Sequence, residues 1–240
     1  MHYPREFFAV QLAFAQKMVA LTQQPYEEAV LHKTAFYRIL GLDWSFDPGN
    51  PVWQDYRAGL RQGETDIDWT YQFYLAHLAS IPEYTTPRWG CFSYEYQPDA
   101  RVIRLHFSGL LDASGYGPLT SLRKDARVAE LRSLFTHLKE KHPDARRVHG
   151  GSWLYNRREY TRLFPAEYGQ SARAVEPSLQ ARGLWGQFLR YTNHINEQVA
   201  TLFLERLDQL RDAEEYAQYF PYQVMITGAP IGVFYDFYGV

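Results

Sequence analysis

The chain has a single cysteine, Cys91, among its 240 residues. One cysteine cannot form an internal disulfide, and a zinc site built mainly of thiolates needs more than one. Long hydrophobic runs are also missing, because no stretch of about 18 consecutive apolar residues occurs, which is the length that a membrane-spanning helix needs. The N-terminus has no basic segment that leads into a continuous apolar run, so no signal peptide is predicted. We therefore expect a cytoplasmic protein without a membrane partner.

Neither sign of charge is in large excess. The chain has 25 Lys and Arg against 27 Asp and Glu, a formal net charge of −2 with histidine neutral. This balance provides no basic field for nucleic acid, and we expect no nucleic-acid partner. Apolar residues make up 46% and charged residues 22%, which is typical of globular proteins. A chain of this length can bury roughly 70–75% of its unfolded surface, so a core needs no metal or disulfide.

Helical periodicity dominates residues 1–82. Apolar residues recur at spacings of three and four from Phe7 to Val19, which is typical of an amphipathic helix. Pro25 and the pair Asn50-Pro51 are helix-start signals, and glycine or proline follows each predicted helix. We predict a helical subdomain or cap over 1–82, with a boundary near 82–87.

Strand and helix patterns alternate over 83–240. A hairpin is predicted from the period-two pattern on both sides of Pro98, and a long helix over 122–141 follows. Further predictions are a strand over 147–155, a helix over 184–210, and a second hairpin formed by 222–227 and 231–238. Together these elements predict an α+β protein, in which an N-terminal helical subdomain packs on a mixed central sheet with flanking helices.

The segment 108–118 lies between a predicted strand and the long helix and contains three glycines. Glycine allows close approach of a backbone to a ligand, and a helix N-terminus offers free N–H groups to a phosphate. Two cations follow in the first turn of the helix. The candidate ligand-binding residues are Gly115, Gly117, Arg123 and Lys124. The alternative is a connection that requires glycine only for its conformation.

A second candidate segment is 148–157. The pair Gly150-Gly151 inside a predicted strand favours a bulge or the close approach of a ligand. Strand ends are where α/β sheets hold ligands, and this segment supplies a base, a hydroxyl, a phenol and an amide. The candidates are His149, Gly151, Ser152, Tyr155 and Asn156. The alternative is a bulged core strand with Trp153 and Leu154 packed inward.

Histidine and cysteine spacings favour no metal centre. No H-x-H, H-x-x-x-H or E-x-x-H spacing occurs, so a metal enzyme that uses His106, His149 and His194 is a less favoured alternative. Cys91 lies inside a strand pattern, where buried cysteines are usually inert. No metal ligand is predicted.

Residues from about 101 to 173 resemble the C-terminal domain of GNAT-like acyltransferases. The resemblance rests on the strand 103–107, the loop that contains glycine and proline, the long helix, the sequence Gly-Ser-Trp-Leu at 151–154 and Leu-Phe-Pro at 163–165. It implies a splayed mixed sheet and an acyl-CoA whose pyrophosphate rests on 114–123. The usual signature of that family, Arg or Gln followed by x-x-Gly-x-Gly/Ala, is absent.

The resemblance implies an acyl-CoA-dependent acyltransferase that acts on an amine of a small molecule or peptide. Its catalytic candidates here are His106 or His149 as the base and Tyr155 or Tyr160 as the acid that protonates the thiolate. The alternative is a non-catalytic, aromatic-rich binding protein. In that interpretation the strand predicted over 231–238 forms a homodimer interface through Tyr235 and Phe237.

Overall fold

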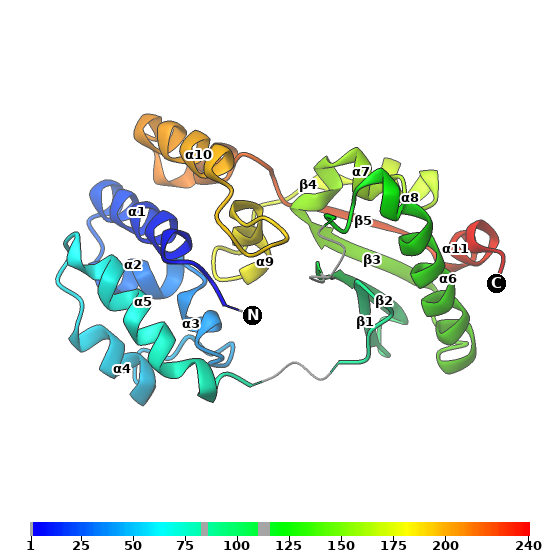
Figure 1. Cartoon of the computed structure of the whole chain (residues 1–240), viewed down its shortest axis with the longest axis horizontal. Coiled ribbons are helices and arrows are strands. Elements are labelled where there is room, and N and C mark those ends of the chain that lie inside the picture. Colours follow the sequence, from blue (N-terminus) through cyan, green and yellow to red (C-terminus); the bar gives the residue numbers. More distant parts are fainter. Residues whose placement is uncertain (1, 83–85, 110–115) are drawn as a thin grey trace. The chain divides into compact units, whose positions relative to one another are not determined.

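The computed structural model describes residues 2–82, 86–109 and 116–240 (Figure 1). The chain divides into two compact units. Unit 1 consists of Met1–Tyr84 and Glu176–Pro221, and unit 2 consists of Thr85–Val175 and Tyr222–Val240. The predicted boundary near 82–87 coincides with the first junction. The predicted second domain over 83–240 differs from this division, because residues 176–221 belong to the helical unit.

Unit 1 is helical. Its α-helices are α1 (Arg5–Thr22), α2 (Tyr26–Lys33), α3 (Phe36–Ile39), α4 (Pro51–Ala58), α5 (Thr65–His77), α9 (Arg182–Trp185) and α10 (Glu197–Gln209). The start signal at residues 50 and 51 is confirmed, because the Asn50 side chain accepts hydrogen bonds from the amides of Val52 and Trp53 while Pro51 occupies the first turn.

Aromatic packing explains why residues 176–221 join unit 1. The ring of Phe14 in α1 lies 5.6–6.1 Å from four rings of this segment, those of Trp185, Phe203, Tyr216 and Phe220. The helix predicted over 184–210 is wrong as a continuous element, since it is divided into α9 and α10. Between them the backbone of Asn193 is left-handed (φ 62°), a conformation that ends regular helix.

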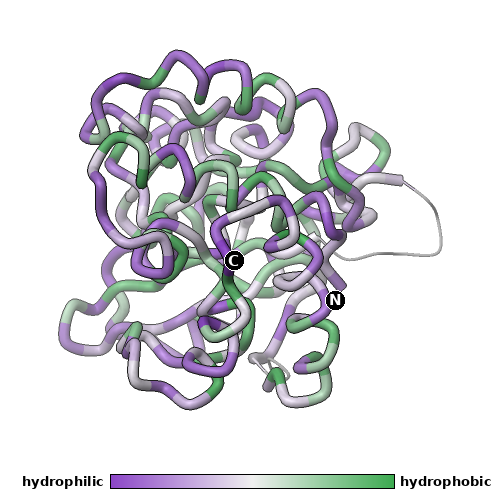
Figure 2. The backbone as a smooth tube through the Cα atoms, turned by 90° about the vertical axis from the view of Figure 1, so that its left-hand side faces the viewer, coloured by the Kyte–Doolittle hydropathy of each residue, from purple (hydrophilic) through white to green (hydrophobic). Residues whose placement is uncertain are grey.

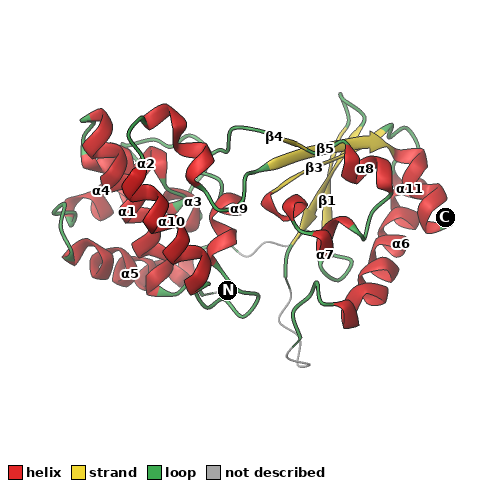
Figure 3. Ribbon diagram, turned by 90° about the horizontal axis from the view of Figure 1, so that it is seen from above, coloured by secondary structure: helices red, strands yellow, loops and turns green. Residues whose placement is uncertain are grey.

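The five strands found in the described residues all belong to unit 2 (Figure 3). They are β1 (Phe92–Gln97), β2 (Val102–Phe107), β3 (Arg147–Ser152), β4 (Arg173–Ala174) and β5 (Met225–Pro230), in the sheet order β1-β2-β3-β5-β4. The predicted first hairpin is confirmed, because β1 and β2 pair antiparallel. The predicted long helix is α6 (Lys124–Lys141), which connects the parallel strands β2 and β3. The mixed α/β fold is therefore confirmed.

The helices of unit 2 cover one face of its sheet (Figures 1 and 3). These are α6, α7 (Arg158–Thr161), α8 (Ala166–Gln170) and α11 (Ile231–Tyr238). Strand alternation directs Ile103, Leu105 and Val148 into the core that these helices enclose. The residues between them, including Arg104 and His149, are exposed on the opposite face, here called the outer face.

The predicted second hairpin is wrong in its final strand, because residues 231–238 form helix α11. Pro230 precedes the helix with a φ of −56°, and Ile231, Phe234 and Tyr238 form its buried stripe. Gly239 ends it in the left-handed conformation (φ 67°). The homodimer predicted through a C-terminal strand therefore has no strand to form it.

Hydrophobic residues occur in short stretches along the backbone, separated by hydrophilic ones (Figure 2). Within 2–82, 86–109 and 116–240, none of the helices combines the length and the apolar character that crossing a bilayer requires.

Candidate functional site

The sheet of unit 2 opens between β2 and β3. The two strands pair from Val102 and Arg147 as far as Leu105 and Gly150. Each strand then continues for two more residues with its other neighbour, since Phe107 pairs with β1 and Ser152 pairs with β5. The last two residues of β2 and the last two residues of β3 are therefore not paired with each other. This edge, formed by 106–107 and 151–152, is called the β2–β3 opening below.

Aromatic rings fill the core side of the β2–β3 opening. Phe107 meets the ring of Tyr160 edge-on at 5.3 Å, and Tyr160 in turn packs 5.2 Å from Tyr155. The Tyr155 hydroxyl bonds to that of Tyr168 at 2.8 Å. A Cβ at Gly150 would lie 1.9 Å from the Tyr155 oxygen, so this glycine makes room for the tyrosine pair and not for a ligand.

The neighbouring glycine has a different environment. Gly151 is exposed on the outer face, and a Cβ there would meet only the Ile226 side chain, at 3.9 Å. The Ser152 hydroxyl accepts a hydrogen bond from the amide of Leu154 (3.1 Å), so it caps the 3-10 turn of residues 153–156. Of the pair predicted as a ligand opening, Gly151 alone is accessible.

Asn156 has a structural position. Its amide nitrogen donates to the backbone carbonyls of Trp153 and Gln223, both at 2.7 Å, and it ties the end of β3 to the segment that enters β5. Asn156 does not cap the following helix, because α7 begins at Arg158 and its N-cap is Arg157.

Both candidate histidines lie on the outer face. His106 Nε2 is 3.8 Å from the carboxylate of Glu95, and Arg104 is 3.7 Å from the same carboxylate. Burial and the nearby Arg104 charge lower the pKa of His106, against the opposing effect of Glu95. Burial, followed by the charges of Arg147 and Arg104, lowers the pKa of His149. Both imidazoles are therefore neutral at pH 7 and can accept a proton.

The structure does not bring the three catalytic candidates together. His106 and His149 are exposed on the outer face, whereas Tyr155 is buried in the core on the other side of the sheet. Burial also raises the pKa of the Tyr155 hydroxyl well above its usual value. The histidines and Tyr155 therefore cannot contact the same small substrate in this arrangement.

The N-terminal end of α6 lies at the same end of the sheet as the β2–β3 opening. Arg127 in its first turns donates to the sulfur of Cys91 (2.8 Å), and Glu130 accepts a hydrogen bond from the Cys91 amide (3.0 Å). Cys91 directly precedes Phe92, which pairs with Phe107 at the end of β2. Because Cys91 is buried and held by these contacts, its position is structural.

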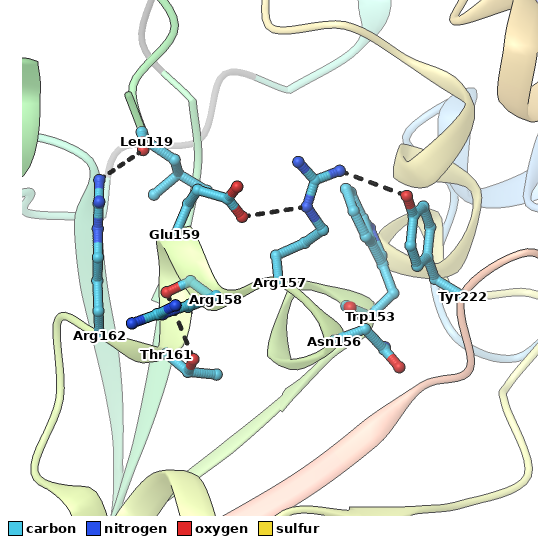
Figure 4. A network of polar contacts seen from close by, with 9 residues as sticks. All are labelled: Leu119, Trp153, Asn156, Arg157, Arg158, Glu159, Thr161, Arg162 and Tyr222. Atoms are coloured by element: carbon cyan, nitrogen blue, oxygen red, sulfur yellow. Dashed lines mark hydrogen bonds and ion pairs between the residues drawn. The ribbon is translucent and has the colours of Figure 1, made fainter. Parts of the chain in front are cut away.

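The candidate phosphate ligands are found just before and at the start of α6. Lys124 is its first residue, and Arg123 precedes it without a side-chain hydrogen bond that caps the helix. The carbonyl of Gly117 accepts a hydrogen bond from the Thr120 amide (3.2 Å). Gly115 lies outside the described residues. Arg162 donates to the carbonyl of Leu119 (3.1 Å) and so links this segment to the end of α7 (Figure 4).

Sequence reasoning missed a cluster of exposed and half-exposed groups beyond β3. The Trp153 and Tyr222 rings stack at 5.5 Å, and Arg157 lies between the Glu159 carboxylate and the Tyr222 hydroxyl, 3.3 Å from each (Figure 4). Trp153 was expected to pack inward in the alternative interpretation. Its partner Tyr222 is 65 residues away from Arg157 in the chain, and no local pattern joins such distant positions.

Metal ligation has no support in the described parts of the chain, where no three His, Cys, Asp or Glu side chains are grouped so that they could hold an ion. The alternative that used His106, His149 and His194 lacks such a group. Comparisons with protein-family models, curated proteins and solved structures found no match for this chain.

Proposed function

We propose that unit 2 binds an acyl-CoA at the β2–β3 opening and transfers the acyl group to an amine. The observation that carries the proposal is the opening itself. Two parallel strands that are joined by α6 stop pairing after Leu105 and Gly150, and a sheet splayed in this way is what the resemblance to GNAT-like acyltransferases implies. Strand edges without a partner present N–H and C=O groups that an amide-containing chain can pair with.

The start of α6 fits the phosphates of such a donor. No side chain caps the start of α6, although the Lys124 amide itself bonds to the carbonyl of Ser121 in the preceding 3-10 turn (residues 121–123), and a helix N-terminus attracts anions. Arg123 and Lys124 add two positive charges at this point. The contacts of Arg127 and Glu130 with Cys91, which directly precedes β1, support this position, because they hold the first turns of α6 beside the end of the sheet where β2 and β3 separate.

His106 is the base in this scheme. When bound, the acyl-CoA supplies a thioester carbonyl, so that attack by an amine nitrogen forms a C–N bond while the C–S bond breaks and the thiolate takes a proton from solvent. The neutral Nε2 of His106 accepts the proton that the amine nitrogen loses. Glu95, 3.8 Å away, stabilises the imidazolium that results. Tyr155 receives no role, since its hydroxyl is bound to Tyr168 in the core.

Titration calorimetry with CoA tests the donor site. We expect the intact protein to bind CoA, and we expect the double variant Arg123→Gln/Lys124→Gln to bind at least about tenfold more weakly, a loss of roughly 1.4 kcal/mol. Lys141→Gln is the matched control, because it removes one charge at the opposite end of α6 and should leave the CoA affinity unchanged. If the wild-type protein does not bind millimolar CoA, the proposal is wrong.

A non-catalytic binding module is the second candidate. It is favoured by the rings of Phe107, Tyr155 and Tyr160, which occupy the core side of the β2–β3 opening. The acyltransferase and the binding module can be distinguished by whether acetyl-CoA is consumed. A binding module would hold acetyl-CoA without producing free thiol in the presence of amines, whereas an acyltransferase would release thiol in proportion to the amide formed.

A further inference from the structure

The outer face of the sheet has a marked excess of cationic and protonatable side chains. Its exposed charged or titratable residues on β1 to β4 are Glu95, Arg104, His106, Arg147, His149 and Arg173. One carboxylate is thus accompanied by three arginines and two histidines. Their arrangement follows from the strand register, in which Arg104 is opposite both Glu95 and His149.

Two glycines, Gly151 and Gly228, lie in the middle of this face. Gly228 of β5 is opposite His149, and a Cβ there would come within 2.6 Å of the imidazole ring. The His149 ring therefore fills the side-chain position of Gly228. Gly151, on β3, is exposed, and a Cβ there would meet only the Ile226 side chain at 3.9 Å. A small ligand can therefore approach the backbone of this face at Gly151, beside the charged side chains.

Glu95 lies beside both Arg104 (3.7 Å) and His106 (3.8 Å), and Arg147 adds a positive charge on the neighbouring strand β3. The Glu95 carboxylate is 3.8 Å from Nε2 of His106, so a carboxylate and the proposed base lie together on β1 and β2. Arg104 and Arg147 flank His149 at the centre. Alternate residues on a strand are roughly 7 Å apart, so a carboxylate at these arginines would lie about one small amino acid's length from His106.

We propose that the outer face binds the acceptor of the acyl transfer, and that this acceptor is a primary amine bearing carboxylates. The inference rests on the proposed function and names its substrate class. The ammonium group lies at Glu95 and His106, and the carboxylates pair with Arg104 and Arg147. Two-pronged hydrogen bonding makes arginine the preferred partner of a carboxylate.

The test is calorimetry on the intact protein in the absence of CoA, with three probes. L-glutamate carries two carboxylates, L-glutamine has lost one of them, and putrescine has amines but no carboxylate. We expect L-glutamate to bind at least about fivefold more tightly than L-glutamine, and we expect no heat from putrescine. Equal affinity for L-glutamate and L-glutamine, or no binding of L-glutamate at millimolar concentration, would overturn the inference.

Arg104→Gln locates the site, because it should weaken L-glutamate binding at least tenfold. Lys141→Gln again removes one positive charge from α6, away from the outer face, and should have no effect. An Arg104→Gln protein that binds L-glutamate like the wild type contradicts the proposed position.

A CoA titration of Arg104→Gln separates the two proposals. We expect its CoA affinity to equal that of the wild type. If the wild type binds CoA and not L-glutamate, the acceptor inference fails while the donor site stands. If it binds L-glutamate selectively and not CoA, the acyl-transfer function fails, and with it the role of this face as an acceptor site.

Discussion

Two adjacent glycines, Gly150 and Gly151, have opposite environments because a strand turns successive residues to opposite faces of the sheet. The sequence indicated that glycine matters in this strand. It could not show that the side-chain position of Gly150 is taken by the hydroxyls of Tyr155 and Tyr168, since hydroxyl contacts of this kind depend on where the 3-10 turn of residues 153–156 and helix α8 pack.

Alanine substitutions distinguish the two positions. Gly150→Ala should lower the free energy of unfolding by about 1–3 kcal/mol, because its methyl group would overlap the Tyr155 oxygen. Gly151→Ala should be neutral or stabilising by up to about 1 kcal/mol, because its methyl group enters open space and the unfolded chain loses freedom. Urea denaturation measures both. Equal destabilisation by the two substitutions would show that our assignment of the faces is wrong.

The environment of His106 gives a second prediction for a single residue. Arg104 lowers the pKa of this imidazole and Glu95 raises it. Arg104→Gln should therefore raise the pKa of His106, and Glu95→Gln should lower it further. An NMR titration of the His106 ring protons measures these values. If His106 is the base, the acidic limb of the pH–activity profile shifts in the same direction as the pKa of His106 in each variant. An acidic limb that stays in place while the NMR pKa changes would exclude His106 as the base.

The ends of secondary-structure elements show what pattern reasoning could and could not reach. The hairpin of β1 and β2 and the long helix α6 were predictable, since each has one clear periodicity and a clear end. Residues 231–238 fit both periods, because Val233, Tyr235 and Phe237 alternate while Ile231, Phe234 and Tyr238 are spaced for a helix face. The packing of Phe234 against Phe135 of α6, at 4.8 Å, favours the helix.

Two phenylalanines of α11 test this orientation. Phe234 is fully buried, so Phe234→Ala should cost about 3–5 kcal/mol of stability. Phe237 is 49% exposed, and Phe237→Ala should cost about 0.5 kcal/mol or less. If residues 231–238 formed a strand, Phe234 and Phe237 would lie on opposite faces, and either one could be the buried residue. Thermal or urea unfolding measures both losses of stability. A larger loss for Phe237→Ala than for Phe234→Ala would contradict the orientation of the helix.

At the scale of the whole molecule, the net charge of −2 is the sum of two units with opposite net charges, −7 and +5. Unit 1 has 10 Lys and Arg against 17 Asp and Glu, and unit 2 has 15 against 10. The expectation that no nucleic acid binds was drawn from the balance of the entire chain. That balance does not describe unit 2, which carries a net charge of +5 and the basic outer face. The positive net charge of unit 2 becomes apparent only when the charges are counted for each unit, because the composition of the entire chain combines them.

Global stability should depend on pH through three histidines. Burial is the main cause that lowers the pKa of His106, His142 and His149 below the usual value of 6.5. The unfolded chain then binds protons at a higher pH than the native state, so stability is complete above pH 6.5 and decreases as the pH falls below it. Urea midpoints at pH 7.5 and 5.5 should show the decrease. A midpoint that is higher at pH 5.5 would contradict the direction of these shifts.

The two units are interleaved in the chain, which has a consequence for synthesis. Unit 1 closes only when residues 176–221 have been made, and β3 receives its neighbour β5 only from the later segment 222–240. A nascent chain on the ribosome must therefore hold an incomplete sheet, with the edge of β3 bare, until residues 222–240 emerge. Deletion of that segment should leave a product prone to aggregate, and neither unit can be expressed alone by cutting the gene at one point.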